Sequence, residues 1–247
     1  MRNWTWQRAV LALVLFGISF GYVEAAVVVY LRQIYQPIRQ QLHPGRPADE
    51  LFPLITTEQL KAQGPAHEHL LVVELGRELA TMVMLAAAAL TVASNGRQWL
   101  AGFALSFGVW DLMFYVFLKV LIDWPASLAT WDILFLVPLP WVGPVWSPCV
   151  VALSMAFGGT VLLRRELSGG EPVRLTAGHW AALVVGALVL MTAWMWDWRN
   201  TMAGNWPNPF NWPLFWVGEA ISLGAFVHAA WWGRRVMSPT AKSPFAS

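Results

Sequence analysis

The chain has 247 residues, of which 57% are hydrophobic and 12% charged, and it contains 17 tryptophans and one cysteine. Charged residues make up about 25% of an ordinary soluble domain, so the composition excludes that class and also a disordered chain. One cysteine excludes an internal disulfide framework and the CxxCH signature of a c-type haem. The net charge of +2, spread along the chain, does not indicate a nucleic-acid partner. The lipid bilayer is the expected partner, and an all-α, polytopic membrane protein is the expected class.

A membrane-spanning helix needs about 20 apolar residues, and six runs of this kind follow one another along the chain. The predicted spans are residues 8–31, 69–93, 99–122, 144–163, 178–196 and 212–232. The stretch 131–143 is apolar too, but Pro138 and Pro140 would break a helix there. It is therefore predicted to be an interfacial or re-entrant segment. Residues 1–237 should form one six-helix transmembrane domain, and 238–247 a disordered C-terminal tail.

The connections predict the orientation of the bundle. Lysine and arginine favour cytoplasmic loops, and they flank the N-terminus, the second and fourth connections and the end of the last span. Both termini are therefore predicted to be cytoplasmic, in a multi-pass protein of a bacterial inner membrane. The outer loop, residues 32–68, contains Thr56 and Gln59 at the spacing of a capping box, which predicts a short helix over 57–63.

Charged side chains inside the predicted spans are the most informative feature. Each costs at least about 2.5 kcal/mol in the bilayer centre, so each needs a partner or a purpose. Counting 1.5 Å per residue from the outer ends places most of them about 8 to 16 Å deep, in one half of the membrane. The predicted spans therefore contain five carboxylates but only two cations to compensate them. The carboxylates are Glu24, Glu74, Glu78, Asp111 and Glu219, and the cations are Arg77 and Lys119.

Because three carboxylates are left over, they must be protonated, reach water or bind a cation. We therefore predict an outward-facing pocket with three sets of residues. The catalytic set is Glu24, Glu78, Asp111, Tyr115 and Glu219; the substrate-binding set is Arg77, Lys119, Trp131 and Trp212; and the metal ligands are Glu74, Glu78 and His69.

A divalent metal ion is the one cofactor that this pattern suggests. The Glu-x-x-His and HExxH spacings are absent, so the metal prediction depends on residue type alone. No nucleotide cofactor is expected, because the chain has neither a Walker A loop nor a GxGxxG turn. His179 and His228 should lie about 10 Å apart in depth and should not form a pair.

The interpretation that best fits the unpaired carboxylates is a membrane-embedded enzyme, or a ligand- or metal-binding protein, that acts on a small or lipidic substrate. Its carboxylates would serve as general acid and base. One alternative is a secondary transporter that couples transport to protons or cations through the same groups. The other is a non-catalytic subunit or assembly factor of a membrane complex, in which the charges fasten helices together or to partner proteins.

Overall fold

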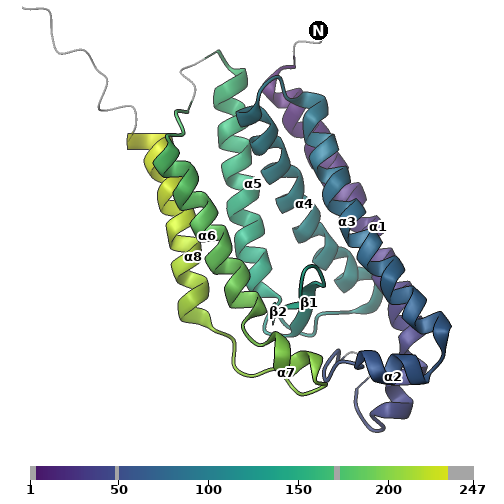
Figure 1. The fold of residues 1–247 in the computed structure, drawn as a ribbon. Coiled ribbons are helices and arrows are strands. Elements are labelled where there is room, and N and C mark those ends of the chain that lie inside the picture. Colours follow the sequence, from purple (N-terminus) through teal and green to yellow (C-terminus); the bar gives the residue numbers. More distant parts are fainter. Residues whose placement is uncertain (1–3, 48–49, 170–172, 233–247) are drawn as a thin grey trace, which may run out of the picture.

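The computed structural model describes residues 4–47, 50–169 and 173–232, which form a bundle of long antiparallel helices (Figure 1). The predicted tail 238–247 lies outside these residues. In chain order, the elements are α1 (Trp6–Leu42), α2 (Thr57–Ala62), α3 (Pro65–Val92), α4 (Gly96–Ile122), β1 (Trp131–Phe135), β2 (Trp141–Pro144), α5 (Trp146–Leu167), α6 (Ala177–Met195), α7 (Trp198–Met202), α8 (Trp212–Val227) and the π-helical turn η1 (His228–Trp232).

Five segments are long and apolar enough to cross a membrane, so the prediction of a largely helical, multi-pass membrane protein is confirmed. They are Trp6–Leu42, Gly96–Ile122, Trp146–Leu167, Ala177–Met202 and Trp212–Ala230. The 28-residue α3 is not among them, although it is as long as the helices that are and packs mainly against α4.

The two ends of the described chain lie at the same end of the bundle. The start of α1 and the last turn of α8 are close to the same level, whereas α2, the β1–β2 hairpin and α7 gather at the opposite end (Figure 1). We call that opposite end the hairpin end. The short elements α2, β1, β2 and α7 lie there, between the long helices.

Helix α1 is longer than predicted. The predicted first span stops at residue 31, but the helix continues to Leu42 through Pro37, so the beginning of the predicted outer loop is helical. Polar residues end the apolar run that predicts a membrane span, but they do not by themselves end the helix. The extension is fixed by Arg39, whose guanidinium donates hydrogen bonds to the carbonyl oxygens of Leu51 and Pro53 in the following loop.

The predicted short helix in this loop is confirmed as α2. The hydroxyl of Thr56 accepts a hydrogen bond from the amide nitrogen of Gln59 at 3.2 Å, and the amide nitrogen of Thr56 donates to the Gln59 side chain at 2.8 Å. This reciprocal pair satisfies amide groups that a helix start leaves free. It stabilises the first turn of α2.

The segment 131–143 is the main departure from an all-α fold. It forms an antiparallel hairpin in which Trp131 lies opposite Pro144, and Asp132 lies opposite Gly143. Its prolines exclude a helix, while its aromatic and branched residues suit a strand. Backbone polar groups in apolar surroundings must be satisfied within the protein, and the two strands achieve this by pairing with each other.

Small residues set the distances between the long helices. A Cβ atom on Gly159 of α5 would lie 2.6 Å from the carbonyl oxygen of Ala101 and from the amide nitrogen of Leu105, both on α4. A Cβ atom on Gly218 of α8 would lie 2.9 Å from the carbonyl oxygen of Gly186 on α6. Such close backbone approach is typical of helices packed in a membrane.

Candidate functional site

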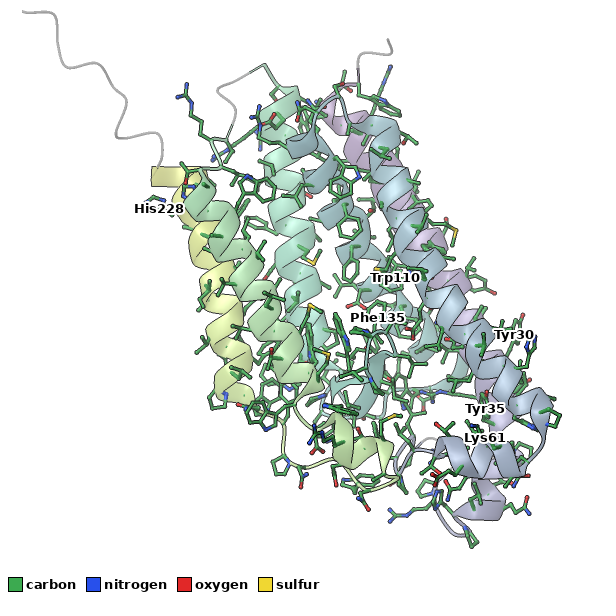
Figure 2. The ribbon with its side chains drawn as sticks, in the orientation of Figure 1. Tyr30, Tyr35, Lys61, Trp110, Phe135 and His228 are labelled. Carbon is green, nitrogen blue, oxygen red and sulfur yellow. The ribbon has the colours of Figure 1, made fainter. Side chains whose placement is uncertain are left out.

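A cavity of about 490 Å³ opens at the hairpin end, between α1, α3, α4 and the hairpin, with α2 and the loop before it forming a further wall. Figure 2 shows Trp110 and Phe135 inside the bundle and Tyr35 nearer the hairpin end, and all three line the cavity. Most of the wall is apolar. Of the residues predicted for the site, the lining includes Glu24, Glu74, Arg77, Glu78, Asp111 and Tyr115.

Arg77 of α3 joins two carboxylates from different helices. Its Nε lies 3.0 and 2.9 Å from the two carboxylate oxygens of Glu74, one turn earlier on α3, and its Nη1 donates to Glu24 of α1. Thr81 donates a further hydrogen bond to Glu24 at 3.4 Å. One guanidinium therefore compensates two carboxylates, and this Arg77 cluster (Arg77, Glu24 and Glu74) fixes α3 to α1.

Glu78, one turn after Glu74, reaches the hairpin. Both of its carboxylate oxygens accept a hydrogen bond from the amide nitrogen of Leu136, at 3.1 and 2.9 Å. Leu136 directly follows β1, so Glu78 holds the tip of the hairpin against α3. A backbone amide is a strong partner for a carboxylate, and this contact gives Glu78 a structural role.

Two residues that sequence reasoning left out of the site, Asp132 and Arg32, lie in the cavity wall. Tyr115 of α4 donates a hydrogen bond to the buried Asp132 at 2.9 Å. Burial raises the pKa of Asp132 from 3.8 to about 6, and the positive charge of Arg32 and the Tyr115 hydrogen bond oppose this rise. The guanidinium of Arg32 also stacks on Trp124, 4.0 Å from the ring centroid. A lone aspartate within the apolar stretch 131–143 was the signal that could have placed Asp132 here.

Asp111 of α4 is the carboxylate whose hydrogen bonding is incomplete. Its side chain lines the cavity and is only 8% exposed, yet its Oδ2 atom has no hydrogen-bond partner within the described part of the chain. Buried carboxylate oxygens in folded proteins are almost always paired, and an unpaired one is costly. This oxygen is therefore available to a ligand.

Four residues of the predicted catalytic and substrate-binding sets lie elsewhere. Glu219 of α8 accepts a hydrogen bond from Ser154 of α5 at 2.5 Å, so it faces a different helix interface. Lys119 pairs with Asp123 at 2.6 Å, at the end of α4. Trp131 packs on the rings of Phe52 and Phe210, and Trp212 packs on the ring of Trp146. None of the four lines the cavity. The sequence predicts the depth of a side chain along its helix, but it does not predict which neighbouring helix that side chain faces.

The structure gives no support to the predicted metal site. Among the residues that it describes, no group of three or more histidine, cysteine, aspartate or glutamate side chains is arranged to hold a metal ion. Glu74 is engaged by Arg77, Glu78 is engaged by Leu136, and His69 is exposed and outside the cavity lining. These three residues do not come together.

The prediction that His179 and His228 lie far apart is wrong. His179 Nε2 lies 2.9 Å from His228 Nδ1, because the first turn of α6 packs beside the last turn of the antiparallel α8. The amide nitrogen of Thr176 donates to His179 Nδ1 at 3.1 Å as part of an N-terminal cap. The pair lies at the end of the bundle opposite the cavity (Figure 2).

The charges around the cavity differ from those counted in the sequence. The lining holds five carboxylates against three arginines, an excess of two negative charges when all are ionised; these residues are Glu24, Glu74, Glu78, Asp111, Asp132, Arg32, Arg39 and Arg77. Comparison with protein families, curated proteins and solved structures finds no match to this chain. Function therefore has to be inferred from the cavity itself.

Proposed function

We propose that this chain is a membrane protein of six spans that binds a small amphiphilic or lipidic molecule in the cavity at the hairpin end. The observation that carries the proposal is Asp111, a buried carboxylate with an unpartnered oxygen inside a largely apolar cavity. Ligand pockets are typically apolar with a few well-placed polar groups, and their volumes run from about 300 to 1,000 Å³. The cavity of about 490 Å³ falls within this range.

The six-span arrangement follows when α3 is counted as a crossing. It is 28 residues long and packs on α4 and α1. With α3 included, the chain crosses an even number of times, which agrees with the shared level of its two described ends (Figure 1). The distribution of cations favours a cytoplasmic location for that level. The cavity would then face the outer side of a cell membrane, and we propose a bacterial inner membrane.

A purely structural role accounts for most of the buried charges, but not for Asp111. Glu24 and Glu74 share Arg77, and Glu78 binds the backbone of the hairpin. Buried pairs of this kind serve helix packing and register. Asp111 fastens no helix through its Oδ2 atom, so its presence in the apolar interior favours a ligand-binding role.

The same carboxylate gives the cavity a group for acid–base chemistry. A carboxylate that meets a ligand at hydrogen-bond distance can accept a proton from it, and burial tunes such a group for catalysis. The neighbouring Tyr115–Asp132 hydrogen bond supplies a second exchangeable proton in the same wall. We therefore include catalysis on the bound molecule in the proposed function.

Native mass spectrometry of the purified full chain tests this proposal. Leu75 lines the cavity, so Leu75→Trp should fill it and displace any co-purifying molecule. Val184, on α6, is 55% exposed and lies outside the lining, so Val184→Trp adds the same ring without filling the cavity. We expect a bound mass in the wild type and in Val184→Trp, and its loss in Leu75→Trp. An equal yield of bound molecule in all three proteins would refute binding in this cavity.

A further inference from the structure

The surroundings of Asp111 combine one carboxylate with several aromatic rings. Trp110, Phe114 and Tyr115 flank it on α4, and Phe135 approaches from β1; all of them line the cavity. The Trp110 and Phe135 ring centroids are 6.3 Å apart, and those of Phe114 and Tyr115 are 5.0 Å apart. Figure 2 shows Trp110 and Phe135 near each other inside the bundle.

Aromatic faces and a carboxylate together favour organic cations. The faces of tryptophan, tyrosine and phenylalanine attract an ammonium group by cation–π interaction, and the attraction is larger when the site is desolvated. A carboxylate adds a charge-assisted hydrogen bond when the cation carries an N–H group. Asp111 Oδ2 is an acceptor that lacks a donor among the described residues, so an N–H group of the ligand would supply the missing hydrogen bond.

The charges of the cavity point to the same class of ligand. The lining holds two more carboxylates than arginines, so an anionic head group would meet repulsion. The nearby cations are already engaged: Arg77 binds Glu24 and Glu74, and Arg39 binds two backbone carbonyls. Arg32 stacks on Trp124, and its charge acts on Asp132. A neutral hydroxyl would satisfy the hydrogen bond of an ionised Asp111 but leave its charge uncompensated, which is costly in a buried site.

The apolar part of the cavity wall indicates that the ligand also has a hydrocarbon portion. Val28 and Leu31 of α1, Leu75 of α3, and Leu54 and Leu60 from α2 and the loop before it all line the same cavity. An ammonium group at Asp111 therefore has a hydrocarbon path beside it. The ligand that suits both parts is an amphiphile with a cationic head and an alkyl chain.

We infer that the cavity binds a protonated amine, with its ammonium group donating to Asp111 inside the Trp110, Phe114, Tyr115 and Phe135 rings and its alkyl portion against the apolar wall. This inference rests on the proposed function and names the class of its ligand. The amine belongs either to a free alkylamine or to the head group of a lipid.

Calorimetric titration with 1-hexylamine and 1-hexanol tests this inference. The two probes have similar chains, but only the amine is cationic at pH 7. The full-length protein is placed in nanodiscs of phosphatidylglycerol, whose head group has no amine. We expect hexylamine to bind at least tenfold more tightly than hexanol, and Asp111→Asn to remove this preference. Glu219→Gln, a buried carboxylate outside the cavity, should keep it.

Phe135→Leu provides a second variant that retains the carboxylate and a side chain of apolar character. It should weaken hexylamine binding several-fold and leave hexanol binding unchanged, because only the cation interacts with the ring face. Equal binding of the two probes, or an unchanged preference in Asp111→Asn, would overturn the inference.

Repeating the titration in nanodiscs that contain phosphatidylethanolamine identifies the source of the amine. Weaker hexylamine binding there supports a lipid head group as the occupant, whereas unchanged binding supports a free amine. If hexanol binds as well as hexylamine while Leu75→Trp abolishes both, the ammonium inference fails and the proposed ligand-binding cavity stands. If no probe binds and no molecule co-purifies in a Leu75-dependent way, both fail.

Discussion

Replacing Arg77 by methionine would leave two buried carboxylates without their shared cation. The side chains of Glu24 and Glu74 are 8% and 15% exposed, and that of Arg77 is 22% exposed. Breaking a buried ion pair by removing one partner costs about 3 to 5 kcal/mol. Because these groups border an open cavity, we expect the lower end, a loss of about 3 kcal/mol in the free energy of unfolding.

Unfolding in mixed micelles of a mild detergent and sodium dodecyl sulfate, followed by tryptophan fluorescence, measures this loss. The triple variant Glu24→Gln, Glu74→Gln, Arg77→Met removes the uncompensated charges along with the cation, so it should recover most of the stability. Arg46→Met is the matched control, since Arg46 and Glu50 form an exposed pair worth under about 1 kcal/mol. The reasoning is refuted if Arg77→Met is as stable as the wild type, or if the triple variant is no more stable than Arg77→Met.

Three further predictions concern the hairpin, the helix interfaces and α2. The pKa of Asp132 is higher in the folded protein, about 6 against 3.8, so its contribution to stability is fully present below pH 3.8 and is lost as the pH rises through 6. Relative to Asp132→Asn, the wild type should lose about 3 kcal/mol over that range; a difference that is flat with pH would contradict this. Gly159→Ala should cost about 3 kcal/mol in the same unfolding assay, because the added carbon meets the backbone of Leu105 at 2.6 Å. Gly158→Ala, whose nearest contact is a side-chain carbon at 3.6 Å, should be close to neutral, and equal effects of the two would argue against close helix packing. Thr56→Ala should weaken α2 by about 1 kcal/mol, which corresponds to roughly fivefold faster amide hydrogen exchange in that helix alone; unchanged exchange would show that the cap is not needed.

Properties that depend on one helix at a time could be predicted from the sequence. Apolar runs of sufficient length located five spans, and the Thr56–Gln59 spacing located α2. The sequence also predicts similar depths for Glu24, Arg77 and Asp111, because a helix rises a fixed 1.5 Å per residue. These three residues do line one cavity. Depth and local capping are set by neighbours along the chain, and the sequence alone contains those neighbours.

Only the tertiary structure decided which of these residues meet. Glu219 lies at a predicted depth similar to that of Glu24 but faces Ser154, whereas Asp132 and Arg32, from a hairpin and an unexpected helix extension, join the cavity wall. The pairing of His179 with His228 likewise follows from the packing of α6 on α8. Contacts of this kind depend on the rotation of each helix about its axis and on its neighbour in the bundle. Both are fixed by the packing of the whole chain, at glycine contacts such as that of Gly159 with α4.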